Sequence, residues 1–412
     1  MISQLKISGF KSLKDAVIPF GALTAFIGAN ASGKSNALEA IRVLQGLALA
    51  YSVRDVFDGR PDDVSRARWP GVRGGAAYAC RRSAAKGPTS TQAVVARFEV
   101  VADVGEGLGV VTWGISVHPE DGIVLDEWLL VGTRPVFDTR EAPNDGGPAI
   151  RARVWKGLGG GKGQPPICSF SPSSAILTQL RGERAQTPKN EETAAVVARA
   201  LADVQFLDPA PAALRAYDLP GAKRILEHGE LFASVVAGIE KDPPTRKAFM
   251  SWLQHLAPSP IEDLHLYSTE LGQRMFGVRE AGSGTVPALS LSDGTLRFAA
   301  IAAALFEPEP PRVLLLEEVE NGVNATRLRL LVEMLRQRSA TGHPQVVVTT
   351  HSPLLLAYLP PERYENVIWF WRDREDGATH ALPVTQIPRF AQVVARTPLS
   401  ELFAEGWLEA AL

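Results

Sequence analysis

The feature that most constrains this chain is a short glycine-rich segment between a strand pattern and a helix pattern. Residues 23–27 (LTAFI) form a short, mostly apolar run, and from about Lys34 to Leu49 apolar residues recur largely on one helical face. The segment between them, Gly28-Ala-Asn-Ala-Ser-Gly-Lys-Ser35, has the spacing GxxxxGK[ST]. Strand, glycine loop and helix in this order predict a buried parallel strand and therefore an α/β fold.

A loop in this position binds phosphate groups. Its backbone N–H groups wrap a β-phosphate, and the positive end of the helix dipole strengthens the attraction. Lys34 then reaches the β and γ oxygens, and the Ser35 hydroxyl ligates Mg2+. The alternative is a glycine-rich turn that contains Lys-Ser by chance, and the flanking strand and helix argue against it. The predicted phosphate-binding residues are Gly28, Asn30, Ala31, Ser32, Gly33, Lys34, Ser35 and Asn36.

Two further strand patterns end in polar residues. Residues 313–316 (VLLL) precede Glu317 and Glu318, and residues 346–349 (VVVT) come just before His351. Because open α/β sheets bind ligands at the carboxyl ends of their strands, one carboxylate is expected to hold Mg2+ and the other to polarise an attacking water. His351 is expected to donate to a γ-phosphate or to hold that water. Taken alone, each feature is more often structural, so the prediction depends on the glycine loop.

A fourth polar segment, LSDGT at residues 291–295, opens a helical pattern that continues to Leu305. The Ser292 hydroxyl and the exposed N–H groups form an anion site at a helix N-terminus. The alternative is an ordinary helix cap by Ser292 or Asp293.

Hydrophobic patterning divides the chain into four parts. Apolar residues alternate over the first twenty residues and over 94–131, which predicts a hairpin and an antiparallel meander. Glycine and proline are frequent in 138–174, short helical patterns broken by proline follow, and after 286 helix and strand patterns alternate as in a parallel sheet. We expect a first lobe with a β-wing over 1–137, a flexible loop over 138–174, a helical insertion over 175–285 and a second lobe over 286–412.

The order of these motifs resembles the ABC-type ATPases of the RecF/SMC/OLD group, and more closely the stand-alone AAA-domain ATPases of bacterial defence loci. The resemblance covers about 1–50 and 286–360, and rests on the glycine loop (Walker A), LSDGT (the signature), LEEVENG (Walker B and D-loop) and TTHS. It implies an α/β, ABC-type P-loop ATPase head with an antiparallel β-wing and a helical insertion. It also implies ATP and Mg2+ as ligands, and a homodimer or higher oligomer with ATP sandwiched between two heads.

The resemblance also implies roles for individual residues. Ser292 and Gly294 contact the γ-phosphate of ATP bound to the Walker A loop of the partner. Glu318 is the catalytic base, His351 the switch histidine and Lys34 a catalytic cation. Glu317 stands where the Walker B aspartate is usual, and its longer side chain still reaches Mg2+ through water. The segment 320–322 (ENG) takes the place of the D-loop, and Val319 replaces the proline that is frequent in relatives.

The spacing of the motifs argues against three kinds of relative. More than half of the chain separates Lys34 from Ser292, whereas transporter subunits place the signature much closer to the phosphate loop. The intervening residues carry no sustained heptad pattern, so a long coiled coil is not expected. Too few residues follow His351 for the metal-binding domain of nuclease-fused relatives.

Charge and composition limit the partners. The formal net charge of -2 excludes a globally basic protein that coats nucleic acid, and the longest apolar run is far shorter than the ~18 residues of a membrane span. The two cysteines, Cys80 and Cys168, lie far apart and favour a cytoplasmic protein without a disulfide framework. One basic cluster is predicted either to contact nucleic-acid phosphates, or to be a solvated loop or a surface for an acidic protein: Arg66, Arg68, Arg73, Arg81, Arg82 and Lys86.

The leading hypothesis is an ATP-hydrolysing dimeric switch that controls a partner effector encoded nearby, a nuclease, in anti-phage defence. The defence role comes from the resemblance alone. The competing hypotheses are a DNA-binding ATPase in repair and a nucleotide-dependent scaffold with negligible turnover.

Overall fold

The computed structural model describes residues 1–60, 69–81, 95–143, 146–156, 164–254, 260–340 and 342–411. The chain packs as two units, each assembled from segments that are distant in the sequence. Unit 1 consists of Met1–Gly21, Gly28–Asp203 and Ile368–Leu382, and unit 2 of Ala22–Ile27, Val204–Val367 and Pro383–Leu412. Within the described residues, no helix combines the length and the apolar character that crossing a membrane would need.

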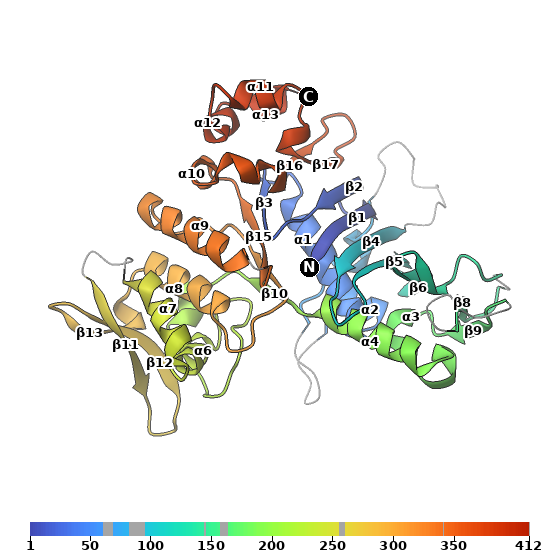
Figure 1. Cartoon of the computed structure of the whole chain (residues 1–412), viewed down its shortest axis with the longest axis horizontal. Coiled ribbons are helices and arrows are strands. Elements are labelled where there is room, and N and C mark those ends of the chain that lie inside the picture. Colours follow the sequence, from blue (N-terminus) through green and yellow to red (C-terminus); the bar gives the residue numbers. More distant parts are fainter. Residues whose placement is uncertain are drawn as a thin grey trace. The chain divides into compact units, whose positions relative to one another are not determined.

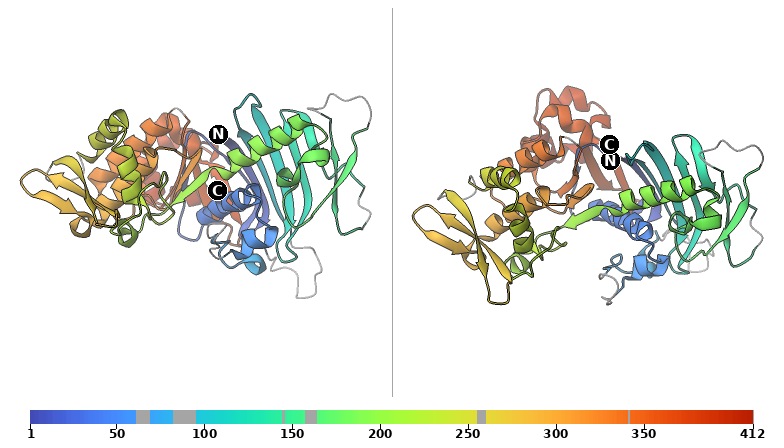
Figure 2. Two further views of the ribbon diagram at one scale, coloured as in Figure 1. Left: turned by 90° about the horizontal axis from the view of Figure 1, so that it is seen from below. Right: turned by 60° about the horizontal axis from the view of Figure 1, so that its bottom comes forward.

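Unit 1 is built on an antiparallel sheet (Figures 1 and 2). The predicted hairpin and meander are confirmed, and their strands belong to a sheet with the order β17-β2-β1-β4-β5-β6-β7-β8-β9. The neighbours from β2 to β9 are antiparallel, whereas β17 pairs with β2 in parallel. Phe98 pairs with Ile7 on one side and with Ile115 on the other, and all three side chains are buried, because alternate residues of each strand face the core. The strands are β1 (Ile2–Phe10), β2 (Leu13–Pro19), β4 (Ala96–Asp103), β5 (Val110–His118), β6 (Ile123–Val131), β7 (Arg134–Asp138), β8 (Ile150–Val154), β9 (Ile167–Phe170) and β17 (Thr379–Pro383).

The structure differs from the expected loop at 138–174. Strands β8 and β9 lie inside this range and pair with each other in antiparallel register. Ala152, Val154 and Phe170 are buried, so short apolar alternation outweighs the surrounding glycines and prolines. Residues 157–163, which hold most of the glycine run, lie outside the described residues.

Helices of unit 1 pack beside this sheet. The predicted helix after the glycine loop is α1 (Lys34–Ala48), and its buried side contacts α4 (Pro188–Ala202). Both views of Figure 2 show α4 lying across the strands of the sheet. The other helical segments are α2 (Val53–Asp58), η1 (Ala76–Tyr78), α3 (Ile176–Gln179) and η2 (Gly182–Ala185).

Unit 2 contains the predicted parallel sheet, in the order β10-β14-β15-β3. All three neighbouring pairs are parallel, and every residue of the four strands is buried, as continuous apolar strands require. Helices α8 and α9 pack against each other in this unit. The strands and helices are β3 (Leu23–Ile27), β10 (Val204–Leu207), β14 (Val313–Leu316), β15 (Gln345–Thr350), α8 (Asp293–Leu305) and α9 (Ala325–Ser339).

The range 175–285, expected to be helical, also contains strands. Besides β10, it includes most of a separate three-stranded antiparallel sheet that packs on α6 and α7. A bulge between Ile261 and Asp263 breaks the period of two in β11, which hides the strand from pattern analysis. The elements are α5 (Pro211–Leu214), α6 (Phe232–Ile239), α7 (Pro243–Leu253), β11 (Ile261–Ser268), β12 (Arg274–Glu280), β13 (Gly284–Pro287) and η3 (Ala288–Ser290). The domain boundaries themselves stay a prediction.

The C-terminal part of the chain contributes short elements to both units. Strand β16 (Val367–Arg372) precedes β17, and short helices follow. The remaining helical segments are α10 (Pro353–Ala357), η4 (Pro361–Asn366), η5 (Val384–Gln386), α11 (Phe390–Val394), α12 (Leu399–Ala404) and α13 (Trp407–Ala410).

Candidate functional site

The glycine loop has the backbone that a phosphate cradle needs. Gly28 and Gly33 adopt φ values of 145° and 106°, which side-chain-bearing residues rarely reach. A Cβ on Gly28 would lie 2.2 Å from the carbonyl oxygen of Phe370, so only glycine fits there. Gly33 precedes α1 without a side-chain cap, and the first turn of α1 contains no acidic residue. A helix N-terminus without a side-chain cap or an acidic first turn favours an anion.

Two polar side chains in the loop fit a phosphate ligand. The Ser32 hydroxyl is buried without a hydrogen-bond partner. The Lys34 ammonium donates to the carbonyl oxygens of Gly28 and Ala29, at 2.6 and 2.9 Å, so its charge is held over the loop. An unpartnered buried hydroxyl beside a buried cation is costly unless an anionic group is bound there.

Three of the predicted site positions follow strands that end at one edge of the parallel sheet in unit 2. Ile27 pairs with Thr350, and Leu316 pairs with Val348, so β3, β15 and β14 finish close together. The next residues along the chain are Gly28, His351 and Glu317. This edge is where parallel sheets place their ligands.

The backbone of Glu318 is strained. Its φ of +44° lies in the left-handed region, which is uncommon for residues other than glycine and typical of functional sites. The Thr349 hydroxyl accepts a hydrogen bond from Glu318 N at 2.9 Å, and Asn321 Nδ2 donates to Glu318 Oε2 at 2.5 Å. Asn321 thus orients the Glu318 carboxylate. The sequence had placed Asn321 in the D-loop and had given it no such role.

Glu320 holds His351. Its Oε1 accepts from the backbone N of His351 at 2.9 Å and lies 3.3 Å from the ring Nδ1. Glu320 is largely buried, whereas the imidazole is about half exposed. Since the carboxylate faces Nδ1, Nε2 is the ring nitrogen left for another group. Nothing in the sequence pattern had pointed to this role of Glu320.

The signature segment packs tightly on the D-loop. Ser292 is the N-cap of α8, as one alternative predicted, because its hydroxyl accepts from Thr295 N at 3.2 Å. A Cβ on Gly294 would lie 2.1 Å from the carbonyl oxygen of Gly322, so this position requires glycine. The Asp293 carboxylate forms an ion pair with Arg215 at 2.6 Å.

Arg327 is a cation that sequence analysis missed. Its Nη1 lies 3.4 Å from the Ser292 hydroxyl and close to Gly294. Burial lowers the pKa of the guanidinium, and among the described residues no carboxylate forms an ion pair with it. A partly buried cation beside a helix N-terminus favours an anion at this place. No sequence signal marked it, because arginine is also frequent on exposed helix faces.

The basic cluster is not a continuous free surface. Arg73 forms an ion pair with Glu39 of α1 at 2.7 Å, and Arg81 forms one with Asp376 at 3.2 Å. Both arginines therefore have carboxylate partners within unit 1. The other four members, Arg66, Arg68, Arg82 and Lys86, lie outside the described residues.

Comparison with protein families gives two matches. Residues 1–66 match a family described as "AAA ATPase domain". Residues 197–357 match a family described as "AAA domain, putative AbiEii toxin, Type IV TA system". The two matches contain the glycine loop and the signature, Walker B and histidine segments respectively. No curated protein matches the chain.

Comparison with solved structures shows the fold. The head described as "SmcHead bound to the C-winged helix domain of ScpA" is similar with a TM-score of 0.54 and 16% identity, over 93% of this chain and 99% of that chain. The SMC head from Thermotoga maritima gives 0.46 and 15%, over 93% and 98%. A Pyrococcus furiosus Smc head bound to the C-terminal domain of ScpA gives 0.47 and 15%, over 96% and 99%. The first match confirms the predicted mixed α/β head, here with an additional three-stranded antiparallel sheet.

Proposed function

We propose that this chain, an ABC-like ATPase of the RecF/SMC type, works as an ATP-hydrolysing switch. In this proposal, a dimer of two such heads controls a partner protein. The observation that carries the proposal is the shared carboxyl edge of β3, β15 and β14, which lead into Gly28, His351 and Glu317. A phosphate loop, an acid and a histidine after neighbouring parallel strands are the parts that phosphoryl transfer uses.

The glycine loop would bind the phosphates of ATP. Its N–H groups, the Lys34 ammonium and the unpartnered Ser32 hydroxyl supply donors to the phosphate oxygens. Mg2+ would be held by the Ser35 hydroxyl and by Glu317, and when bound it neutralises charge on the β and γ oxygens. The predicted contacts of Asn30, Ala31 and Asn36 belong to the same proposal.

Glu318 would act as the general base. Its carboxylate, directed by Asn321, accepts a proton from the attacking water, and the oriented His351 donates a hydrogen bond from Nε2 to the γ-phosphate. Exposure of both side chains agrees with a reaction at the protein surface.

A second protomer would complete the site. Ser292 and Gly294, with Arg327 beside them, present hydrogen-bond donors and positive charge, and the head-to-tail arrangement of the family would place them on the partner's γ-phosphate. Binding of ATP then links two heads, and hydrolysis releases them. We propose that the switch controls an effector, a nuclease, in defence. The second family description, which names a putative toxin of a toxin–antitoxin system, supports the defence role, and the nuclease is part of the proposal alone.

Three proteins test the proposal: the wild type, Lys34→Ala and Glu318→Gln. Phosphate release, nucleotide affinity and molar mass with and without Mg-ATP are measured for each. We expect turnover by the wild type alone, loss of nucleotide binding in Lys34→Ala, and a stable ATP-bound dimer without turnover in Glu318→Gln. ATP binding without turnover by the wild type would favour the scaffold instead. Absence of ATP binding by the wild type would refute the proposal.

The DNA-binding alternative is tested with part of the predicted basic cluster. Arg73 and Arg81 are paired with carboxylates within unit 1, so replacing them would also break these ion pairs. Arg66, Arg68, Arg82 and Lys86 are the appropriate residues. Salt-dependent DNA affinity that is lost when these four are replaced by alanine would support DNA binding, and unchanged affinity would exclude this cluster as its site.

A further inference from the structure

We infer that Thr379, which no motif includes, is a positioning residue that fixes the conformation of the phosphate loop. Thr379 begins β17 and is completely buried. It lies more than 340 positions after the loop in the sequence but touches it in unit 1. The inference rests on the proposed function, because it concerns the same ATP site.

The first argument is steric. A Cβ built on Gly33 would lie 2.3 Å from Thr379 Oγ1 and 2.6 Å from its Cγ2. The threonine side chain therefore fills the space that the missing side chain of Gly33 leaves open. Gly33 has a φ of 106°, and Thr379 packs directly against this unusual backbone. The loop cannot relax toward Thr379 without a clash.

The second argument is a hydrogen-bond chain whose direction is determined. Thr379 Oγ1 lies 2.9 Å from the carbonyl oxygen of Ser32 and 2.7 Å from the Ser12 hydroxyl. A carbonyl can only accept, so the single proton of Thr379 goes to Ser32. The Ser12 hydroxyl must then donate to Thr379, and it accepts in turn from Asn36 Nδ2 at 2.6 Å.

This chain of hydrogen bonds joins two points of the sequence, one before Gly33 and one after Ser35, to Thr379 and Ser12. Ser32 precedes Gly33, and Asn36 lies in the first turn of α1, so the residues between them include Lys34 and Ser35. Thr379 thereby holds the backbone before the two residues that would bind ATP and Mg2+, and Ser12 holds the side chain of Asn36 after them. A phosphate site is most effective when its donors are fixed before the ligand arrives, since no free energy is then lost in ordering them.

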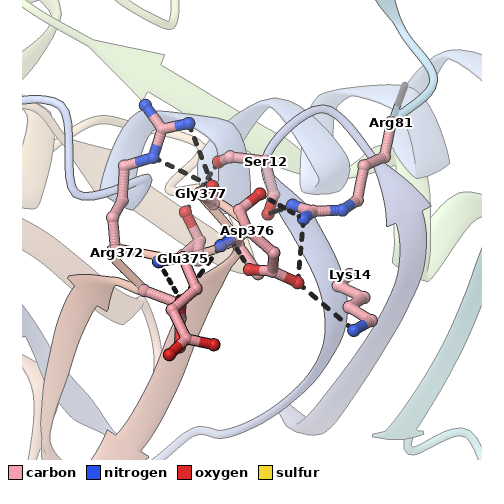
Figure 3. A network of polar contacts seen from close by, with 10 residues as sticks. Ser12, Lys14, Arg81, Arg372, Glu375, Asp376 and Gly377 are labelled. Carbon is pink, nitrogen blue, oxygen red and sulfur yellow. Dashed lines mark hydrogen bonds and ion pairs between the residues drawn. The ribbon is translucent and has the colours of Figure 1, made fainter. Parts of the chain in front are cut away.

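The turn before Thr379 is itself anchored (Figure 3). The Asp376 carboxylate faces Lys14 and Arg81, each at 3.2 Å. Arg81 also donates to the carbonyl oxygens of Ser12 and Asp376, at 3.0 and 2.8 Å. On the other side of the turn, Arg372 donates to the Gly377 carbonyl. Thr379 N donates to Ser12 O at 2.7 Å, so the anchored turn is also bonded to the β1–β2 turn.

The test uses two substitutions at Thr379. Thr379→Val keeps the shape of the side chain but removes the hydroxyl, and Thr379→Ser keeps the hydroxyl. Nucleotide Kd with a fluorescent ATP analogue, steady-state KM and kcat, and the melting temperature are measured for both. We expect Thr379→Val to raise Kd and KM about tenfold with a smaller change in kcat, and Thr379→Ser to restore most of the affinity. Thr112→Val in β5, the same substitution at a partly buried threonine of another strand, is the control and should leave Kd unchanged.

Ser12→Ala gives a second approach should Thr379→Val fail to fold, because Ser12 is only partly buried and supplies the middle of the chain. We expect it to raise Kd in the same direction, about threefold to tenfold. Wild-type affinity in both Thr379→Val and Ser12→Ala would overturn the inference while leaving the proposed ATPase intact. A melting temperature that falls without a change in Kd would overturn it as well. Absence of ATP binding by the wild type would refute both proposals.

Discussion

The phosphate loop in unit 1 and the signature–Walker B region in unit 2 are supported in different ways. The loop is held by buried contacts with residues far away in the sequence, above all Thr379 and Ser12. Glu318 and His351 are exposed, and residues closer in the sequence orient their side chains. Asn321 orients Glu318, and Glu320, about thirty positions before His351, orients the histidine. We interpret the first region as complete within one protomer and the second as one that requires a partner head.

The largest expected effects come from two glycine substitutions, one in each region, which should affect ATP binding and turnover differently. Gly33→Ala would clash with Thr379 and should abolish ATP binding. Gly294→Ala would clash with Gly322 and should lower turnover about 100-fold or more while ATP still binds, because it displaces only the signature. Titration with a fluorescent ATP analogue and phosphate release measure the two effects. Loss of ATP binding in Gly294→Ala would contradict the separation.

The next effect concerns the orientation of the Glu318 carboxylate. Asn321→Asp replaces the hydrogen-bond donor with a second negative charge beside the carboxylate. A neighbouring like charge raises a carboxyl pKa, so the base is protonated at higher pH than in the wild type. We expect kcat to fall about tenfold, with the acid limb of its pH profile moved to higher pH. An unmoved acid limb would show that Asn321 does not act on the base.

Arg327 tests the need for a partner. Arg327→Ala should weaken ATP-dependent dimerisation and lower turnover about threefold to tenfold, whereas Arg327→Lys should retain part of the effect because it keeps the charge. ATP affinity at the phosphate loop should not change. Sedimentation of each variant with Mg-ATP at several protein concentrations measures this. If Arg327→Ala dimerises like the wild type, the residue does not contribute to assembly.

The last expected effect lies away from both regions and concerns stability alone, with no effect on ATP binding or turnover. Glu127 of unit 1 is completely buried, and this burial raises its pKa from 4.5 to about 7, although Trp113 Nε1 and the N–H groups of Ile176 and Leu177 donate to it. The folded state therefore holds a proton that the unfolded state has lost, and stability falls as pH rises from about 4.5 to about 7. This difference corresponds to ~3 kcal/mol.

Urea unfolding at several pH values measures this dependence. Glu127→Gln should reduce the slope in that pH window. Glu307 in unit 2, whose pKa burial also raises to about 7, provides a matched comparison, because Glu307→Gln should remove a separate share of the slope. ATP affinity measured at one pH should be the same in both variants. An unchanged slope in Glu127→Gln would mean that this carboxyl is ionised in the folded protein.

Local sequence determined the parts of the site that depend on local geometry. Gly28 and Gly33 mark a loop that needs unusual φ values, and alternating or continuous apolar residues mark the strands that precede Glu317 and His351. Each of these signals lies within a few neighbouring residues, so a single sequence carries it. The order of the motifs along the chain was enough to predict an ABC-type head.

The tertiary structure decided which residues support that site. Thr379 against Gly33, Gly294 against Gly322 and Arg327 beside Ser292 join residues that no periodic pattern relates. Strand β11 was missed for a different reason, because its bulge interrupts the local alternation of apolar residues. Contacts of this kind depend on how the strands are ordered in space, and strand order is set by burial over the whole chain rather than by any short segment.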